Sequence, residues 1–416
     1  MKNYVIIGSG VAGISAADEI RRLDPSGRIT IFNGEPYPYY FRAALSFYFK
    51  GEISEEELQG KPAGWAKDNR IRIMNDRVKE IRVNEKEVVG ESMVCEPFDK
   101  LLIATGAWPF TLPWPGVDLE GVFTYRGVVC ARNKRDFVKK RGVKTSVVIG
   151  GGILGIEMAE NFQNLGIKTC IIDRADRILP LLFDETGSSI IKDQFESDGV
   201  RVLPKVEVTE FVGEDQKLTG VTLNNGETIQ ADMVIVSVGS RPYVDFLADS
   251  GIELDRGVVV DENLRTNCAD IYSAGDVAVQ KIDGALVPCR TWLTAAHMGV
   301  RAGANMAGPE APFLEKVFFN ASHAYRSIYA IVGRFNAEEG NAVRALSQKT
   351  GKEKYQKIFI EGDKVIGGAF INDVYPAWQV YRAIEHDVRL DSDALKKAKT
   401  PADILNAIPH LPQLLY

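Results

Sequence analysis

The segment that decides the fold is KNYVII (residues 2–7) followed by GSGVAG (residues 8–13). The apolar run before the glycines predicts a strand, and the residues after them continue with the apolar spacing of a helix. In a unit of this kind Gly8 makes the tight turn, Gly10 lets the backbone approach a pyrophosphate, and Gly13 lets helix and strand pack closely. The phosphates then face the positive end of the helix. The segment therefore predicts a dinucleotide-binding turn.

A second strand, RITIF (residues 28–32), follows at the distance expected for such a unit. A carboxylate near the end of this strand would bind the ribose hydroxyls. Glu35 is our candidate for this role. Asn33 is a second candidate, because it stands at the strand end itself, where an acidic residue is commonest.

The same pattern occurs a second time, and here all of its parts are present. TSVVI (residues 145–149) leads into GGGILG (residues 150–155), a helix follows, and the strand KTCII (residues 168–172) ends in Asp173. Two complete units in one chain are far more specific than a single glycine motif. The sequence therefore predicts two dinucleotide sites.

Three further apolar strands end in small-residue turns. The first ends in Ala104-Thr105-Gly106, the second in Gly239 and the third in Gly275-Asp276. Ligands of open parallel sheets bind outside the carboxyl ends of the strands, so these turns are candidates for further cofactor contacts.

These motifs carry a resemblance to a known family. The two glycine turns, the Ala104–Gly106 turn, the segment 238–242 and the Gly275-Asp276 pair occur in the order seen in flavoproteins with two dinucleotide sites. Residues 1–310 resemble the FAD-dependent pyridine nucleotide-disulfide oxidoreductases. Residues 35–46 are most similar to ferredoxin and rubredoxin reductases and to the flavin module of assimilatory nitrite reductases.

The resemblance implies a cofactor arrangement. FAD would bind across the first glycine turn, with Asp276 at its ribityl or pyrophosphate part, and the helix that begins near Trp292 would point its positive end at the flavin. NAD(H) would bind on the second turn, with Glu157 beside the nicotinamide as the candidate catalytic residue. Glu157 could instead be a solvated helix carboxylate, and Arg42 an exposed arginine at a helix start. The candidate cofactor-binding residues are Gly8, Gly10, Val11, Ala12, Gly13, Asn33, Glu35, Arg42, Ala104, Thr105, Gly106, Gly150, Gly152, Ile153, Leu154, Gly155, Asp173, Gly239, Gly275, Asp276 and Trp292.

The end of the second ribose-binding strand bears on the choice of nucleotide. Asp173 suits the free ribose hydroxyls of NADH and would repel the 2′-phosphate of NADPH. We therefore expect NAD(H). The neighbouring Arg174 and Arg177 could accommodate a phosphate, so NADP(H) stays open as the alternative.

The cysteine positions indicate what kind of chemistry to expect. Disulfide reductases of the resembled superfamily place redox cysteines on the helix after the first ribose-binding strand. No cysteine occurs from Glu35 to Gly60, which argues against dithiol and single-cysteine chemistry. Electrons that reach the flavin would then leave by direct transfer.

We accordingly expect an FAD-dependent NAD(P)H oxidoreductase that exchanges electrons between NAD(H) and an iron-sulfur acceptor or donor, such as rubredoxin, ferredoxin or a partner subunit. Two alternatives stay open. An NADH oxidase that reduces oxygen needs only an accessible reduced flavin, and an NADH-binding flavoprotein sensor would turn over hardly at all.

Composition and charge narrow the partner classes. With 45% hydrophobic and 25% charged residues the chain has the composition of a globular protein, and its net charge of −6 comes without a sustained basic run. These features argue against nucleic-acid binding. No apolar run approaches the length of a membrane span. Five scattered cysteines, none in a CxxC pair, fit the cytoplasm and suggest no intrinsic metal site.

The predicted fold class is α/β, with two Rossmann-like three-layer dinucleotide-binding domains and a C-terminal α+β domain. We expect the FAD-binding domain in residues 1–112 and 240–312, the NAD(P)H-binding domain in residues 113–239 and the third domain in residues 313–416. The proline-rich segment 108–116 predicts the crossing between the first two. The C-terminal domain is a candidate for an oligomer contact.

Overall fold

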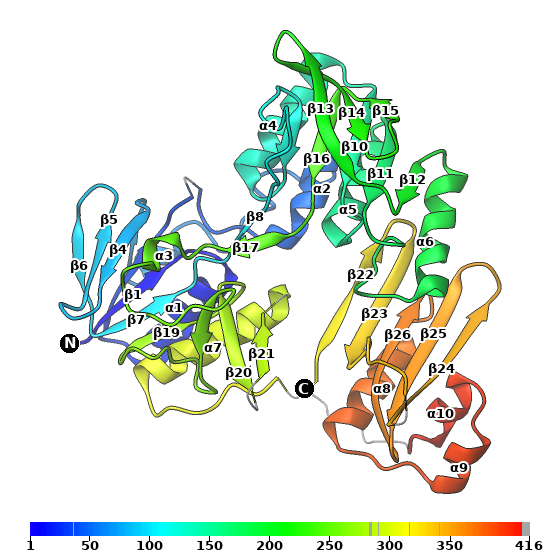
Figure 1. Cartoon of the computed structure of the whole chain (residues 1–416). Coiled ribbons are helices and arrows are strands. Elements are labelled where there is room, and N and C mark those ends of the chain that lie inside the picture. The colour runs from blue at the N-terminus through cyan, green and yellow to red at the C-terminus, as the bar shows by residue number, and fades with distance from the viewer. Residues whose placement is uncertain (36, 283–284, 290, 316, 341, 410–416) are drawn as a thin grey trace. The chain divides into compact units, whose positions relative to one another are not determined.

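The computed structural model describes residues 1–409 except 36, 283–284, 290, 316 and 341, and the C-terminal segment 410–416 lies outside the described residues. Its internal contacts divide the chain into two compact units (Figure 1). Unit 1 comprises Met1–Phe110, Arg126–Arg135 and Ser240–Leu314, and unit 2 comprises Thr111–Tyr125, Asp136–Gly239 and Glu315–Tyr416. Each unit is described by itself.

A five-stranded parallel sheet forms the centre of unit 1, in the order β3-β2-β1-β7-β19. Its strands are β1 (Asn3–Ile7), β2 (Arg28–Phe32), β3 (Ile71–Met74), β7 (Lys100–Ile103) and β19 (Ile271–Ser273). Two helices, α1 (Val11–Leu23) and α7 (Trp292–Ala307), pack against each other. Because β1 pairs with β2 on one side and β7 on the other, the strand order reverses beside β1, which is where such sheets bind ligands.

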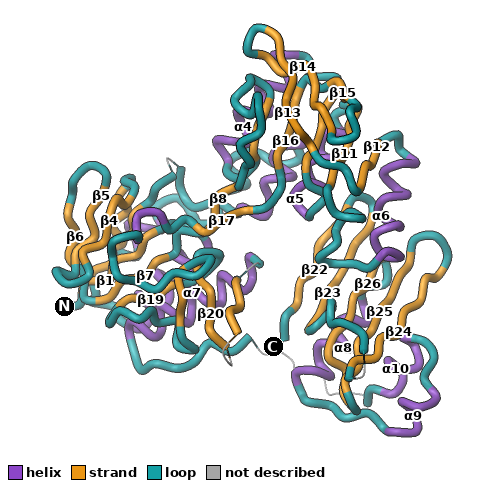
Figure 2. The backbone as a smooth tube through the Cα atoms, viewed as in Figure 1, coloured by secondary structure: helices purple, strands orange, loops and turns teal. Residues whose placement is uncertain are grey.

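Smaller elements complete unit 1. Three antiparallel strands form one small sheet, a strand pair forms a second, and a three-stranded sheet forms a third (Figure 2). The strands are β4 (Val78–Arg82), β5 (Glu87–Gly90) and β6 (Cys95–Pro97); β8 (Ala107–Pro109) and β17 (Ser240–Pro242); and β18 (Val258–Val260), β20 (Ala278–Ile282) and β21 (Ala285–Pro288). The short helices are η1 (Arg42–Ala44), α2 (Leu45–Lys50), α3 (Trp65–Asp68) and η2 (Asp245–Leu247).

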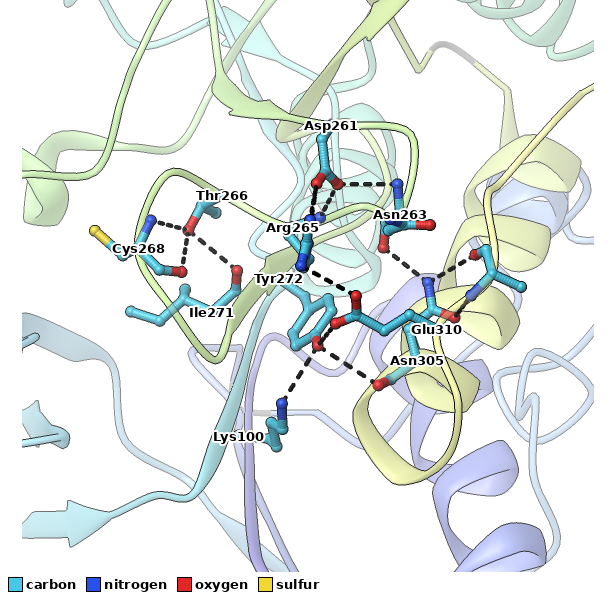
Figure 3. A network of polar contacts seen from close by, with 11 residues as sticks. Lys100, Asp261, Asn263, Arg265, Thr266, Cys268, Ile271, Tyr272, Asn305 and Glu310 are labelled. Carbon is cyan, nitrogen blue, oxygen red and sulfur yellow. Dashed lines mark hydrogen bonds and ion pairs between the residues drawn. The ribbon is translucent and has the colours of Figure 1, made fainter.

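Polar contacts fix the ends of β19 and α7 in unit 1 (Figure 3). The Tyr272 hydroxyl donates to Glu310 Oε1 at 2.6 Å, and Arg265 forms an ion pair with the same carboxylate at 3.1 Å. The Asn305 side chain, near the end of α7, donates to the carbonyls of Asn263 and Ala311. These bonds hold β19 against α7, and β19 leads directly into Gly275-Asp276.

Unit 2 repeats the parallel arrangement, in the order β12-β11-β10-β16-β9. The strands are β9 (Val122–Thr124), β10 (Thr145–Ile149), β11 (Lys168–Asp173), β12 (Arg201–Pro204) and β16 (Met233–Val236), and the helices are α4 (Val128–Arg141), which begins in unit 1, α5 (Ile153–Asn164) and α6 (Glu185–Ser197). An antiparallel sheet adds β13 (Val208–Glu214), β14 (Lys217–Leu223) and β15 (Thr228–Gln230).

A second, antiparallel sheet in unit 2 has the order β22-β23-β26-β25-β24 and its own apolar core. Its strands are β22 (Phe319–Ala324), β23 (Ser327–Gly333), β24 (Val343–Thr350), β25 (Lys354–Glu361) and β26 (Lys364–Ile371), with the helices α8 (Tyr375–Glu385), α9 (Ser392–Lys397) and α10 (Pro401–Ala407). Its neighbouring strands pair antiparallel, and the central strands β23 and β26 carry continuous runs of buried residues.

The predicted α/β fold class is therefore confirmed: two parallel sheets, each entered by a strand, glycine turn and helix, are followed by a C-terminal α+β region. Within the part of the chain that the structure describes, no helix is both long enough and apolar enough to cross a lipid bilayer.

Candidate functional site

A cavity of about 380 Å³ lies in unit 1 where β1, β2, β7 and β19 end. It collects residues that lie far apart in the sequence. The predicted residues on its wall are Gly8, Gly10, Val11, Ala12, Asn33, Glu35, Arg42, Ala104, Thr105, Gly106, Gly275, Asp276 and Trp292.

The first glycine turn has the geometry that a pyrophosphate requires. Gly10 is the N-cap of α1 and has extended backbone, with φ of −74° and ψ of −177°. A Cβ added there would meet nothing within 4 Å, so the backbone is open on that side. Gly13 lies behind the turn, where an added Cβ would come within 2.0 Å of the Gly8 carbonyl oxygen. Close helix–strand packing thus requires glycine at this position.

Asn33 directly follows β2 and organises the loop around the turn. Its side-chain oxygen accepts from the Ser9 hydroxyl at 2.7 Å, and its amide nitrogen donates to the Tyr37 carbonyl and to Asn75 Oδ1, each at 3.0 Å. The side chain is buried. Asn33 thus reaches the cavity wall while its amide is engaged by the protein.

Glu35 is surrounded by hydrogen-bond donors. Its Oε1 atom accepts a hydrogen bond from Arg42 Nη2 at 2.9 Å and forms an ion pair with Arg126 Nη1 at 3.1 Å. Its Oε2 atom accepts from the Tyr40 hydroxyl at 3.0 Å. Burial alone would raise the pKa of Glu35, but Arg42 and Arg126 outweigh it and hold the pKa below its usual range. The carboxylate is therefore ionised at neutral pH.

Arg126 is held by contacts to both its side chain and its backbone carbonyl. Its guanidinium stacks over the Trp108 ring at 3.8 Å from the centroid, and its Nε donates to the Ala107 carbonyl at 2.8 Å. Arg42 donates to the Arg126 carbonyl at 2.8 Å, so the two arginines are neighbours. Burial and then the charge of Arg42 lower the pKa of Arg126 to about 10, against the opposing effect of Glu35.

Asp276 faces the cavity from the loop after β19. Its side chain is exposed to the cavity space, while protein encloses it elsewhere. This enclosure raises the pKa of the Asp276 carboxyl, with Arg42 and a hydrogen bond from Cys289 acting in the opposite direction. Trp292 starts α7, whose N-cap Thr291 accepts from the Thr294 N–H. The positive end of α7 therefore faces the same cavity.

Several wall residues were not identified from the sequence. Arg126 lies two residues before the start of α4 at Val128, near a helix end where a cation gains nothing from the helix dipole, which is the signal that could have found it. Arg77 lies over the rings of Trp108 and Tyr243 at 5.4 and 5.9 Å. These residues belong to turns whose local sequence carries no motif, so their place at the cavity follows from the tertiary fold.

The second glycine turn, in unit 2, repeats the first. Gly152 is the extended N-cap of α5 with nothing within 4 Å of an added Cβ, and a Cβ at Gly155 would come within 1.8 Å of the Gly150 carbonyl oxygen. The Asp173 carboxylate, at the end of β11, accepts from the N–H groups of Gly151 at 2.6 Å and Ala175 at 2.8 Å. Ile153 and Leu154 open α5, and Gly239 follows β16 with a φ of +113°.

Glu157 lies on α5 in the turn after Gly155 and is half-buried. Burial, and next the charge of Glu157, raise the pKa of Tyr329 to about 12, so this carboxylate lies near the Tyr329 phenol of β23. Arg177 donates to Asp176 at 2.7 Å and to the Phe183 carbonyl at 3.1 Å. Arg177 is thus engaged by protein groups.

The five cysteines are free thiols, and none lines the described part of the cavity. Among the described residues, no three His, Cys, Asp or Glu side chains are grouped closely enough to hold a metal ion.

Residues 2–303 match the family model described as pyridine nucleotide-disulphide oxidoreductase. The chain belongs to this family. The resemblance stated from the sequence motifs is therefore confirmed, and the two parallel sheets with their glycine turns are the family's dinucleotide-binding architecture. As a member of this oxidoreductase family, the chain is an enzyme of the redox class.

Individual relatives agree with this assignment. The chain is 28% identical over 394 residues to the nitrite reductase [NAD(P)H] of Bacillus subtilis, covering 93% of this chain and 47% of that protein. It is 30% identical to the rubredoxin-NAD(+) reductase of Pseudomonas putida, covering 74% of this chain and 80% of that protein. The chain thus spans about half the length of the nitrite reductase and most of the rubredoxin reductase.

Among solved structures, a ferredoxin reductase from Rhodopseudomonas palustris superposes with a TM-score of 0.89 at 24% identity, over 98% of this chain and 99% of that one. At this identity the likeness shows the fold, and it extends through the C-terminal sheet as well as the two parallel ones.

Proposed function

We propose that the chain is an FAD-dependent oxidoreductase that exchanges electrons between NAD(H) and an iron-sulfur protein or the iron-sulfur subunit of a larger complex. The observation that carries this proposal is the pair of glycine turns with the same local geometry, one in each unit. A dinucleotide cofactor and a dinucleotide substrate both need such a turn. Electron flow can run in either direction.

FAD fits the cavity of unit 1. The open backbone at Gly10 and the first turn of α1 would receive the pyrophosphate, which the guanidinium groups of Arg42 and Arg126 would neutralise. Asp276 would accept hydrogen bonds from the ribityl part. The start of α7 at Trp292 would face the flavin ring, where its dipole favours negative charge. When bound, FAD couples the two electrons of NADH to single-electron transfer.

NAD(H) fits the turn of unit 2. The backbone of Gly152, Ile153 and Leu154 at the start of α5 would bind its pyrophosphate, and Asp173 would accept hydrogen bonds from the ribose hydroxyls. A 2′-phosphate would meet the Asp173 carboxylate, and Arg177 is engaged by Asp176 and Phe183. The arrangement thus supports NADH over NADPH. Glu157, one turn into α5, would orient the nicotinamide.

The acceptor follows from the absence of a thiol relay. No cysteine occurs between Glu35 and Gly60. Electrons would therefore pass directly from the flavin to a one-electron centre on a partner, as they do to rubredoxin in the rubredoxin-NAD(+) reductase relative according to its name. We further propose residues 1–112 and 240–312 as the FAD domain, residues 113–239 as the NAD(H) domain apart from the segment Arg126–Arg135, which belongs to unit 1 and adds Arg126 to the FAD cavity, and residues 313–416 as a partner or oligomer domain. The free cysteines favour the reducing cytoplasm.

The test is anaerobic reduction of the purified full chain. We expect a protein with flavin absorption that bleaches with NADH and reduces added rubredoxin or ferredoxin in preference to oxygen. Oxygen consumption at the same rate without an iron-sulfur protein would favour an NADH oxidase. A flavin that NADH bleaches only over many minutes would favour a sensor. A colourless protein that does not bind added FAD would refute the proposal altogether.

A further inference from the structure

The carboxylate of Glu35 has hydrogen-bond partners in the cavity wall that its position after β2 does not explain. Both of its oxygens are engaged by the protein: Arg42 and Arg126 meet at Oε1, and the Tyr40 hydroxyl donates to Oε2. In unit 2 the Asp173 carboxylate accepts from two backbone N–H groups, whereas Glu35 meets two charged guanidinium groups. These contacts instead direct Glu35 toward the two arginines.

The two guanidinium groups need such a partner. Arg42 and Arg126 lie side by side in the cavity wall, and burial together with the charge of Arg42 lowers the pKa of Arg126. Like charges at short range repel, and long side chains lose rotamer entropy when they are ordered. One carboxylate shared by both groups offsets the repulsion and orders both side chains. Tyr40, which is 5% exposed, fixes the carboxylate from its other side.

We propose that Glu35 is a positioning residue that holds Arg42 and Arg126 as a paired clamp for the diphosphate of a dinucleotide. This inference rests on the proposed FAD site and assigns the clamp to unit 1 alone. Glu35 itself does not need to touch the ligand. The charged and titratable groups around the clamp are Tyr40, Arg77 and Asp276, in addition to the two arginines.

Removal of the Glu35 carboxylate should change diphosphate affinity in the direction opposite to that expected from charge repulsion alone. A carboxylate beside an anion site repels the anion, so its removal should improve diphosphate binding if Glu35 acted only through its charge. If Glu35 orders the two arginines, its removal should weaken diphosphate binding in spite of that repulsion.

The variant Glu35→Gln in the full chain tests this. The readouts are FAD affinity from flavin fluorescence, and the displacement of FAD by ADP and by dideoxy-ADP, which lacks both ribose hydroxyls. Displacement of FAD reports on the unit 1 cavity alone. We expect affinity for FAD and for both ADP probes to fall about tenfold, by the same factor for each.

Other outcomes overturn the proposal. Unchanged or tighter binding of ADP means that Glu35 contributes only charge, and a loss confined to ADP with dideoxy-ADP unaffected means that Glu35 binds the ribose. If Glu35→Gln does not fold, Glu35→Asp keeps the charge and shortens the reach by one methylene. Weaker binding of both ADP probes then supports the clamp, and unchanged binding refutes it.

A matched control exists in the same unit. Glu55 accepts from the Tyr37 and Tyr48 hydroxyls and pairs with Arg132 at 2.6 Å, but it does not line the cavity. Glu55→Gln should therefore leave the affinities unchanged, and an equal loss there would mean that any lost carboxylate cluster loosens the unit. If wild-type protein binds no FAD, the proposed function fails, whatever the variants do.

Discussion

The same added methyl group should weaken FAD binding at Gly10 and lower the free energy of unfolding at Gly13. At Gly10 the backbone is extended, with φ of −74°, and an added Cβ has nothing within 4 Å. Alanine there gains about 0.4–1 kcal/mol from the reduced entropy of the unfolded chain and loses a similar amount as a poorer N-cap. The unfolding free energy of flavin-free Gly10→Ala should therefore stay within about 1 kcal/mol of wild type.

At Gly13 the methyl carbon would lie 2.0 Å from the Gly8 carbonyl oxygen and 3.2 Å from its carbonyl carbon. These are backbone atoms, so α1 itself has to move away from β1. Overpacking of this kind costs about 1–3 kcal/mol, and Gly13→Ala should unfold at clearly lower urea concentration.

For FAD binding, the substitution that leaves stability unchanged should have the direct effect. The methyl of Gly10→Ala occupies the space through which the pyrophosphate approaches, so we expect at least about a tenfold loss of FAD affinity in a normally stable protein. The assay pairs urea midpoints of flavin-free protein with FAD titrations. The reasoning would be refuted if Gly10→Ala kept the FAD affinity of wild type. It would also be refuted if Gly13→Ala had the same urea midpoint as wild type.

Three other outcomes follow from the described contacts. Asp173→Ala should raise the KM for NADH more than that for NADPH, by about tenfold in the ratio, and an unchanged ratio in steady-state assays would remove Asp173 from the specificity argument. Glu157→Gln should slow flavin reduction by NADH about tenfold or more in anaerobic stopped-flow while the FAD content stays constant; wild-type rates would return Glu157 to a solvated helix carboxylate. Arg126→Gln should lower FAD affinity about tenfold or more, because the diphosphate loses one charged partner, and wild-type affinity in FAD titrations would remove Arg126 from the site.

The sequence motifs predicted those parts of the site that are local. A strand, a glycine turn and a helix lie within about twenty residues, so the pattern itself contains the geometry. Gly8, Gly10 and Gly13 accordingly have the backbone that their spacing predicts. The same holds for Asp173, which is the last residue of β11.

The parts that depend on distant contacts could not be predicted in this way. Arg42 and Arg126 are 84 positions apart, and only the folded chain brings their side chains together. Trp108 and Tyr243 likewise meet because β8 pairs with β17. No periodicity or spacing carries such pairings, since they depend on how separate segments pack in three dimensions.

A comparison of the two turns shows why the residue at the strand end differs between them. Asp173 accepts from Gly151, inside its glycine turn, and from Ala175, two residues further on. Asn33 accepts from Ser9, at the matching place in its turn, and from the N–H of Glu35, also two residues further on. An amide oxygen and a carboxylate thus accept hydrogen bonds at matching places of the two turns, and the two strand-end residues differ in charge.

The charge difference matches the ligands proposed for the two units. In unit 2 the negative charge stands at the strand end, where Asp173 accepts from two backbone N–H groups and would disfavour a 2′-phosphate on the ribose. In unit 1 the strand end is neutral, and the nearest carboxylate, Glu35, is committed to Arg42 and Arg126. Exchanging only the strand-end residue, as Asn33→Asp, would add a second carboxylate beside the diphosphate clamp and keep the acceptors for Ser9 and Glu35, but it would remove the amide donor to the Tyr37 carbonyl and Asn75. FAD should then bind more weakly and flavin-free protein should unfold at lower urea concentration, whereas unchanged FAD affinity would mean that the neutral residue at this position carries no selectivity.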